Sequence, residues 1–152
     1  MFKKILSVFM ACALVFGSAR AELKVDIVAG ATEPISIAVQ KFEVAGTASP
    51  KDAAMLREVV ENDLKTTGLF RIANHDAFPE YVKMGDMPKF NLWSAIKAQV
   101  LVQAKLYAES GNRYKLEFSD WDVAGTEQIE AHSLVASKKS ARRLAPMMGD
   151  AI

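Results

Sequence analysis

The alternation of apolar and polar positions predicts several strands of a sheet. From Ile35 to Phe42, β-branched side chains recur at every second position, which predicts a buried strand before a loop from Glu43 to Thr47. The stretch from Val100 to Tyr107 is apolar enough to lie at the centre of a sheet. From Tyr114 to Val123 the pattern alternates again, and the preceding Gly111-Asn112 predicts an antiparallel hairpin between these two strands.

One predicted helix organises the first half of the chain. Ser49 is a suitable N-cap, Pro50 fits the first helical position, and Asp52 stands where a capping box places an acid. The apolar residues that follow share one helical face: Met55, Leu56, Val59, Val60 and Leu64. Gly68 fits the left-handed position after the helix, and a short strand from Phe70 to Ala73 is expected beside the first strand. A helix that leads directly into a strand indicates an α/β layer.

The rest of the chain contains a long loop and further short elements. Between Asn74 and Phe90 the periodicity fails, which predicts a surface loop. Asn91 is expected to cap a short helix with these residues on one side: Leu92, Trp93, Ala95 and Ile96. Gln128 to Ser137 is predicted to be a return strand, and Ser140 to Ile152 a basic helix. This predicted helix has Leu144, Met147 and Met148 on its apolar side.

The first 21 residues have the pattern of a secretory signal peptide. The start, Met1-Phe2-Lys3-Lys4, is basic, and the run from Ile5 to Phe16 carries no charge. The small residues in Ala19-Arg20-Ala21 fit cleavage before Glu22. About 12 apolar residues are too few to span a membrane. We therefore expect residues 1–21 to be removed on export to the periplasm, which leaves 131 of the 152 residues.

Removal of the signal peptide changes the cysteine count and the charge. The only cysteine, Cys12, lies in the signal peptide, so the remaining chain has no thiol for a disulfide, a metal site or a nucleophile. Three of the 19 basic residues leave with it, so 16 basic residues face 18 acidic ones and the net charge becomes −2. A near-neutral chain lacks the excess of positive charge that proteins use to bind the phosphates of nucleic acids. No second apolar run of about 18 residues predicts a membrane span.

The residues that could support catalysis do not form a recognised pattern. The two histidines, His75 and His132, have acids nearby at Asp76 and Glu130. The serines that could complete a triad lie outside any Gly-x-Ser-x-Gly elbow: Ser94, Ser119 and Ser133. We therefore expect surface histidines and no enzymatic activity.

Two charged clusters have ordinary interpretations. Glu117, Asp120 and Asp122 supply only part of a calcium-binding loop, so we expect solvated carboxylates, no metal and no cofactor. The second cluster could meet anionic lipid, but such clusters are more often a solvated helix face: Lys138, Lys139, Arg142 and Arg143. Trp93 is expected in the core, whereas Trp121 fits the core or a recognition surface equally well.

The N-terminal segment of the exported chain has the pattern of an exposed strand. From Leu23 to Val28 apolar and polar residues alternate, with Leu23, Val25 and Ile27 on one face. A loop from Ala29 to Pro34 follows. Two arrangements are open: the strand adds to the sheet of a partner, or it packs on its own domain. We expect residues 22–34 to be a mobile partner-binding segment and residues 35–152 to be an α/β domain.

The order of these motifs resembles that of the amino-terminal domain of the TolB family of periplasmic proteins. The resemblance rests on the following stretches: the signal ending Ala19-Arg20-Ala21 before Glu22, the strand Leu23 to Val28, Ile35-Ser36-Ile37-Ala38-Val39 with Phe42, Asp63 to Phe70, Trp93-Ser94-Ala95, and Tyr114-Lys115-Leu116. It implies a three-layer α/β fold, with a mixed sheet of about five strands flanked by helices. It also implies that the chain is truncated before a six-bladed β-propeller.

The resemblance further implies two partners within the Tol–Pal system. One is the C-terminal domain of TolA, which family members contact through the segment that here comprises Glu22, Leu23, Lys24, Val25, Asp26, Ile27, Val28, Ala29, Gly30, Ala31, Thr32 and Glu33. The other is the lipoprotein Pal, which the family contacts mainly through the propeller. The implied roles are outer-membrane integrity, constriction during cell division and bacteriocin import. The alternative is an accessory domain of an exported hydrolase whose active site lies in a missing C-terminal part.

Overall fold

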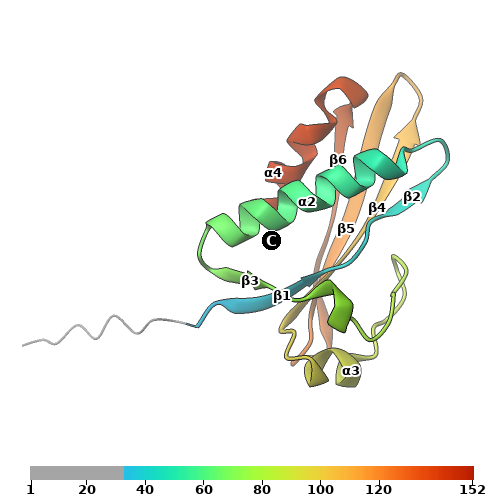
Figure 1. Ribbon diagram of the computed structural model, residues 1–152. Coiled ribbons are helices and arrows are strands. Elements are labelled where there is room, and N and C mark those ends of the chain that lie inside the picture. The colour runs from blue at the N-terminus through green and yellow to red at the C-terminus, as the bar shows by residue number, and fades with distance from the viewer. Residues whose placement is uncertain (1–32) are drawn as a thin grey trace, which may run out of the picture. The chain divides into compact units, whose positions relative to one another are not determined.

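Six strands form one mixed sheet in residues 33–152, the part of the chain that the computed structural model describes (Figure 1). The strands are β1 (Ile35–Val39), β2 (Glu43–Ala45), β3 (Phe70–Ile72), β4 (Val100–Glu109), β5 (Arg113–Asp122) and β6 (Glu127–Ser137). Their order is β3-β1-β4-β5-β6, with β2 also beside β4. β1 is parallel to β3 and β4, whereas β4, β5 and β6 are antiparallel. The mixed α/β sheet is therefore confirmed, with one strand more than expected.

Helices cover both faces of this sheet. The helical elements are α2 (Pro50–Thr66), the 3₁₀ helices η1 (His75–Ala77) and η2 (Lys138–Arg143), α3 (Phe90–Ala95) and α4 (Leu144–Gly149). α2, η2 and α4 share one apolar core with the sheet, whereas α3 and the chain before it pack on the opposite face. The three-layer arrangement predicted from the sequence is thus confirmed.

The ends of α2 follow the local signals in the sequence. Ser49 Oγ accepts a hydrogen bond from the backbone N–H of Asp52 at 3.3 Å, and Pro50 is the first helical residue. Gly68 has φ +74°, the left-handed conformation expected after the helix. The residues of α2 that are buried are Ala53, Leu56, Val60 and Leu64. Because β1 and β3 are parallel, the chain between them must cross the sheet, and α2 makes that crossing.

The first predicted strand is interrupted, and β2 replaces part of the loop expected from Glu43 to Thr47. Val39 pairs with Val102 of β4, and Glu43 pairs with Lys105 of the same strand. The chain from Val39 to Glu43 therefore contains one residue more than the facing stretch of β4. Such a bulge resets the alternation of side chains. Val39 and Phe42 therefore both enter the core beneath α2, which strict alternation would not allow.

The segment expected to be a surface loop covers the second face of the sheet. Val82 is only 6% exposed and packs with Trp93, which is fully buried as predicted. The buried Gln40 amide holds this segment: its Nε2 donates to the Glu80 carbonyl at 3.1 Å, and its Oε1 accepts from the Val82 N–H at 3.3 Å. Asn91 lies within α3 and does not cap it, because the helix begins one residue earlier.

The predicted terminal helix is two short helices. η2 ends at Arg143, and α4 begins at Leu144. Pro146 has no backbone N–H, so it fits only the first turn of a helix, and here it lies in the first turn of α4. Leu144 and Met148 are fully buried as expected, but Met147 is 47% exposed.

Asp120 is buried, contrary to the expectation of a solvated carboxylate. Asp120 is only 4% exposed, and its Oδ1 has no hydrogen-bond partner among residues 33–152. On the neighbouring strands it pairs with Val102 and Glu130. Burial raises the pKa of Asp120 to about 7, His132 acts to lower this pKa, and Glu130 acts to raise it. Trp121 is also buried, at 7% exposure.

The packing of α2 predicts the effect of shortening Leu64. Leu64 is 1% exposed, so Leu64→Ala should lower the free energy of unfolding by about 3 kcal/mol through lost burial and a cavity. Leu69, which is 65% exposed, provides a matched control, and Leu69→Ala should change stability by less than about 0.5 kcal/mol. Urea unfolding followed by tryptophan fluorescence measures both. Equal losses in the two variants would contradict the assigned core.

Asp120 predicts a pH dependence of stability. Its folded pKa lies above the ordinary value of 3.8, so between these values the folded chain holds a proton that the unfolded chain has released. Raising the pH from about 4 to about 7 should therefore destabilise the domain, with a contribution of up to about 1.4 kcal/mol per pH unit. Asp120→Asn removes this contribution.

The measurement for Asp120 is chemical denaturation at several pH values. The stability of Asp120→Asn relative to the parent chain should rise steadily between about pH 5 and about pH 7. Glu58→Gln is the control, because Glu58 is exposed on α2. A difference between parent and Asp120→Asn that stays constant with pH would refute the buried, protonated carboxyl.

Candidate functional site

The predicted partner-binding segment from Glu22 to Glu33 lies almost entirely outside the described residues. Only Glu33 belongs to them, and it is exposed two residues before β1 begins. It lines a hollow of about 330 Å³ together with Arg71, Lys97 and Gln99, among others. The assignment of this segment therefore stays a prediction.

A groove opens at the carboxyl ends of the parallel strands β1 and β3. Lys41 lies two residues after β1, and His75 lies three residues after β3. α2 contributes Arg57 and Glu61 from the other side. Two hollows of about 310 and 390 Å³ are each lined by Lys41, Arg57 and His75. The carboxyl ends of parallel strands are a common place for binding sites in α/β folds, because loops diverge there.

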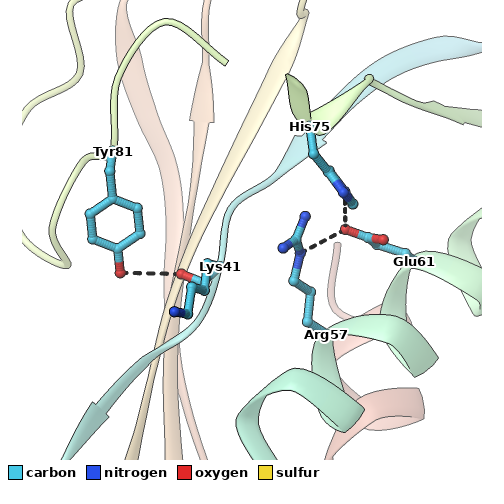
Figure 2. Close-up of polar contacts among 5 residues, drawn as sticks. All are labelled: Lys41, Arg57, Glu61, His75 and Tyr81. Atoms are coloured by element: carbon cyan, nitrogen blue, oxygen red, sulfur yellow. Dashed lines mark hydrogen bonds and ion pairs between the residues drawn. The ribbon is translucent and has the colours of Figure 1, made fainter. Parts of the chain in front are cut away.

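Two separate sets of polar contacts order this groove (Figure 2). Glu61 Oε1 accepts a hydrogen bond from Arg57 Nε at 2.9 Å and lies 2.8 Å from His75 Nε2. On the opposite side, the Tyr81 hydroxyl donates to the carbonyl of Lys41 at 3.2 Å. The first set ties the segment after β3 to α2, and the second ties the loop before α3 to the end of β1.

Aromatic contacts hold the His75 side of the groove. The Phe78 ring meets the His75 ring edge-on, with centroids 5.5 Å apart, and meets buried Trp93 with centroids 5.2 Å apart. Because Trp93 lies in the second core, these contacts connect His75 to a fixed part of the domain. The groove is therefore largely pre-formed.

The groove carries two cations, Lys41 and Arg57. The Lys41 ammonium makes no ion pair within residues 33–152, and Arg57 uses only its Nε for the hydrogen bonds found there. These cations could face an anionic group. No serine, threonine or cysteine is among the described residues that line the two hollows.

The second histidine has acidic neighbours but no nucleophile. His132 Nε2 lies 2.7 Å from Glu130 Oε2, as the sequence indicated, and its ring stacks on Phe118. Ser119 lies on the opposite face of the sheet from Phe118, where its hydroxyl donates a hydrogen bond to Gln103 Oε1 at 3.2 Å.

The burial of Asp120 was not predicted from the sequence. Alternation along a strand does not show which of its polar side chains will be buried in the folded domain. In the described part of the chain no group of three or more His, Cys, Asp or Glu residues could hold a metal ion.

Two solved structures share the fold of this chain. The crystal structure of TolB from Acinetobacter baumannii matches with a TM-score of 0.64 and 18% identity, over 78% of this chain and 27% of that one. The LpoB C-terminal domain from Salmonella enterica matches with a TM-score of 0.55 and 15% identity, over 72% and 87%. At these identities the similarity establishes the fold alone. Among residues 33–152 no helix combines the length and the apolarity that crossing a membrane requires.

Sequence comparison identifies the family. The Tol-Pal system protein TolB of Paramagnetospirillum magneticum is 33% identical over 135 residues, which cover 88% of this chain and 30% of that protein. The chain thus spans less than a third of this relative's length. Residues 23–129 match the TolB amino-terminal domain. These residues make up most of the chain, and the chain therefore belongs to the TolB amino-terminal domain family.

Proposed function

We propose that this chain is a periplasmic protein–protein interaction component of the Tol–Pal system. The family match over residues 23–129 is the observation that carries the proposal, and it begins within the segment from Glu22 to Glu33. In the proposal this segment binds the C-terminal domain of TolA after residues 1–21 have been removed on export. A β-propeller after residue 152 makes the main contact with Pal.

Strand addition is the proposed binding mechanism at the N-terminal segment. Leu23, Val25 and Ile27 occupy alternate positions, so they would fill pockets on one face of the partner's sheet. Backbone N–H and C=O groups of the segment would pair with the exposed edge of that sheet. The polar residues Lys24 and Asp26 would face the other side.

The described domain is consistent with this mechanism because the segment leads into an inner strand of its sheet. β1 follows the segment directly and is held between β3 and β4. The N–H of Ile35 donates to the carbonyl of Leu69 at 2.8 Å, so pairing begins at the first residue of β1. A partner bound at the segment would therefore be attached to a rigid sheet. Through TolA and Pal the whole protein would contribute to outer-membrane integrity, constriction during division and bacteriocin import.

A hydrolase accessory role has no comparable support. The matched family is that of the TolB amino-terminal domain, and the matched relative from Paramagnetospirillum magneticum is a TolB protein. The interaction role accounts for the export signal and for the family match together.

The proposal predicts loss of TolA binding when the apolar face of the segment is changed. Calorimetric titration with the purified TolA C-terminal domain should detect binding to the chain from residue 22. The triple variant Leu23→Asp, Val25→Asp, Ile27→Asp should bind about 100-fold more weakly, because three apolar contacts are lost. Deletion of residues 22–33 should abolish binding.

The matched control changes the polar face of the same segment. Lys24→Ser with Asp26→Ser should alter the affinity by less than about threefold, because these side chains face away from the proposed pockets. Thermal unfolding by circular dichroism verifies that each variant keeps its fold. TolA binding that survives the deletion of residues 22–33 would reject the proposed site.

A further inference from the structure

The outermost strand of the sheet has a long unpaired edge. β6 pairs only with β5, and no backbone hydrogen bond from the rest of residues 33–152 reaches its other edge. β6 has 11 residues, whereas strands commonly have about five or six. The free N–H and C=O groups of such an edge can pair with another extended chain.

A groove lies at the C-terminal end of this strand. Its volume is about 540 Å³, and β6, η2, α4 and the residue after α4 line it with Val135, Ala136, Ser137, Ser140, Arg143, Pro146, Met147 and Asp150. We call it the β6–α4 groove; Figure 1 labels the two elements that give it its name. Leu144 and Met148 are fully buried and fix α4 on the core, so this wall of the groove is rigid.

The groove exposes apolar side chains that no described residue covers. Val135 and Met147 are each 47% exposed. A strand added beside β6 would turn alternate side chains towards opposite faces of the sheet. Those on the helix side would meet Met147 and Pro146, and those on the other side would meet Val135. An incoming peptide with alternating apolar residues therefore fits the groove.

The helix η2, which borders the groove, is strongly basic. η2 carries Lys138, Lys139, Arg142 and Arg143, and none of them forms an ion pair within residues 33–152. The Lys138 ammonium lies 5.2 Å from the centroid of the Tyr114 ring. Among the described residues that line the groove, Arg143 is the one cation and Asp150 is the one acid, so the excess of positive charge comes from the other three cations of η2. The charges therefore favour an acidic chain over a basic one.

We propose that the β6–α4 groove binds an extended, acidic peptide segment of a partner protein, which adds to β6 as a further strand. Backbone pairing with β6 provides the register, the apolar contacts at Val135 and Met147 provide affinity, and the cations of η2 select for acidic residues. This combination of a sheet edge and an adjacent helix is a recurrent mode of peptide recognition. The surface is distinct from the segment Glu22 to Glu33, so the inference does not depend on the TolA contact.

Two peptides of opposite charge test the proposal on the complete exported chain. The first is an acetylated, amidated heptapeptide of alternating glutamate and valine, and the second replaces each glutamate by lysine. Nuclear magnetic resonance titration should show binding of the acidic peptide at β6 and α4. Amide hydrogen exchange on the free edge of β6 should slow about tenfold or more. The basic peptide should bind at least about tenfold more weakly.

Substitutions at exposed positions assign the binding to this groove. Met147→Glu should weaken binding of the acidic peptide about tenfold or more, because it adds a charge to the apolar wall. Arg142→Glu with Arg143→Glu should reverse the preference, so that the lysine peptide binds more tightly. Lys83→Glu is the matched control, since this exposed cation lies on the segment before α3, and it should leave both affinities unchanged. Thermal unfolding confirms that the variants fold.

Five results would overturn the proposal. Equal affinity for the two peptides, or protection of amides outside β6, would remove the proposed selectivity or site. Binding of phosphatidylglycerol vesicles that Arg142→Glu abolishes, without peptide binding, would make the basic cluster a lipid contact. Concentration-dependent self-association that protects β6 would make the edge an interface between copies. Protection of β6 that is lost on Leu23→Asp in the free chain would mean that the chain's own segment occupies the edge.

Discussion

The packing of α2 against β1 and β3 is the contact on which the rest of the domain depends. Two parallel neighbours cannot be joined by a tight turn, so the chain between them must cross one face of the sheet. The apolar stripe of α2, centred on Leu56, Val60 and Leu64, makes that crossing favourable because it buries against the strands. Once β3 lies beside β1, the carboxyl ends of both strands open towards the same edge of the sheet.

That arrangement also explains why the groove around Arg57 and His75 exists. α2 supplies one wall, and the segment after β3 must turn around the edge of the sheet to reach the second face. Buried Gln40 pairs with the backbone of this segment, so both ends of its own side-chain amide are hydrogen-bonded beneath it. The same stretch thus closes the second core and forms the polar groove, whose contacts connect the two layers.

The antiparallel half of the sheet plays a different part. β4, β5 and β6 extend to ten or eleven residues each, well beyond β1 and β3. η2 and α4 cover one face of this half near its C-terminal end, and the outer edge of β6 stays unpaired within residues 33–152. The two proposed binding surfaces use different parts of the chain. One is the segment that enters the sheet at β1, and the other is the edge at which the sheet ends.

Local features of this protein could be predicted from the sequence because their causes are local. The Ser49 cap, the left-handed Gly68 and the hairpin at Gly111-Asn112 depend on residues within a few positions of one another. The tertiary structure decided what depends on neighbours across the sheet. The extra residue before Glu43 becomes visible only against β4, and the burial of Asp120 appears only in the assembled sheet. Glu61 meets His75 only after α2 has crossed the sheet. No sequence period encodes which distant side chains will face one another.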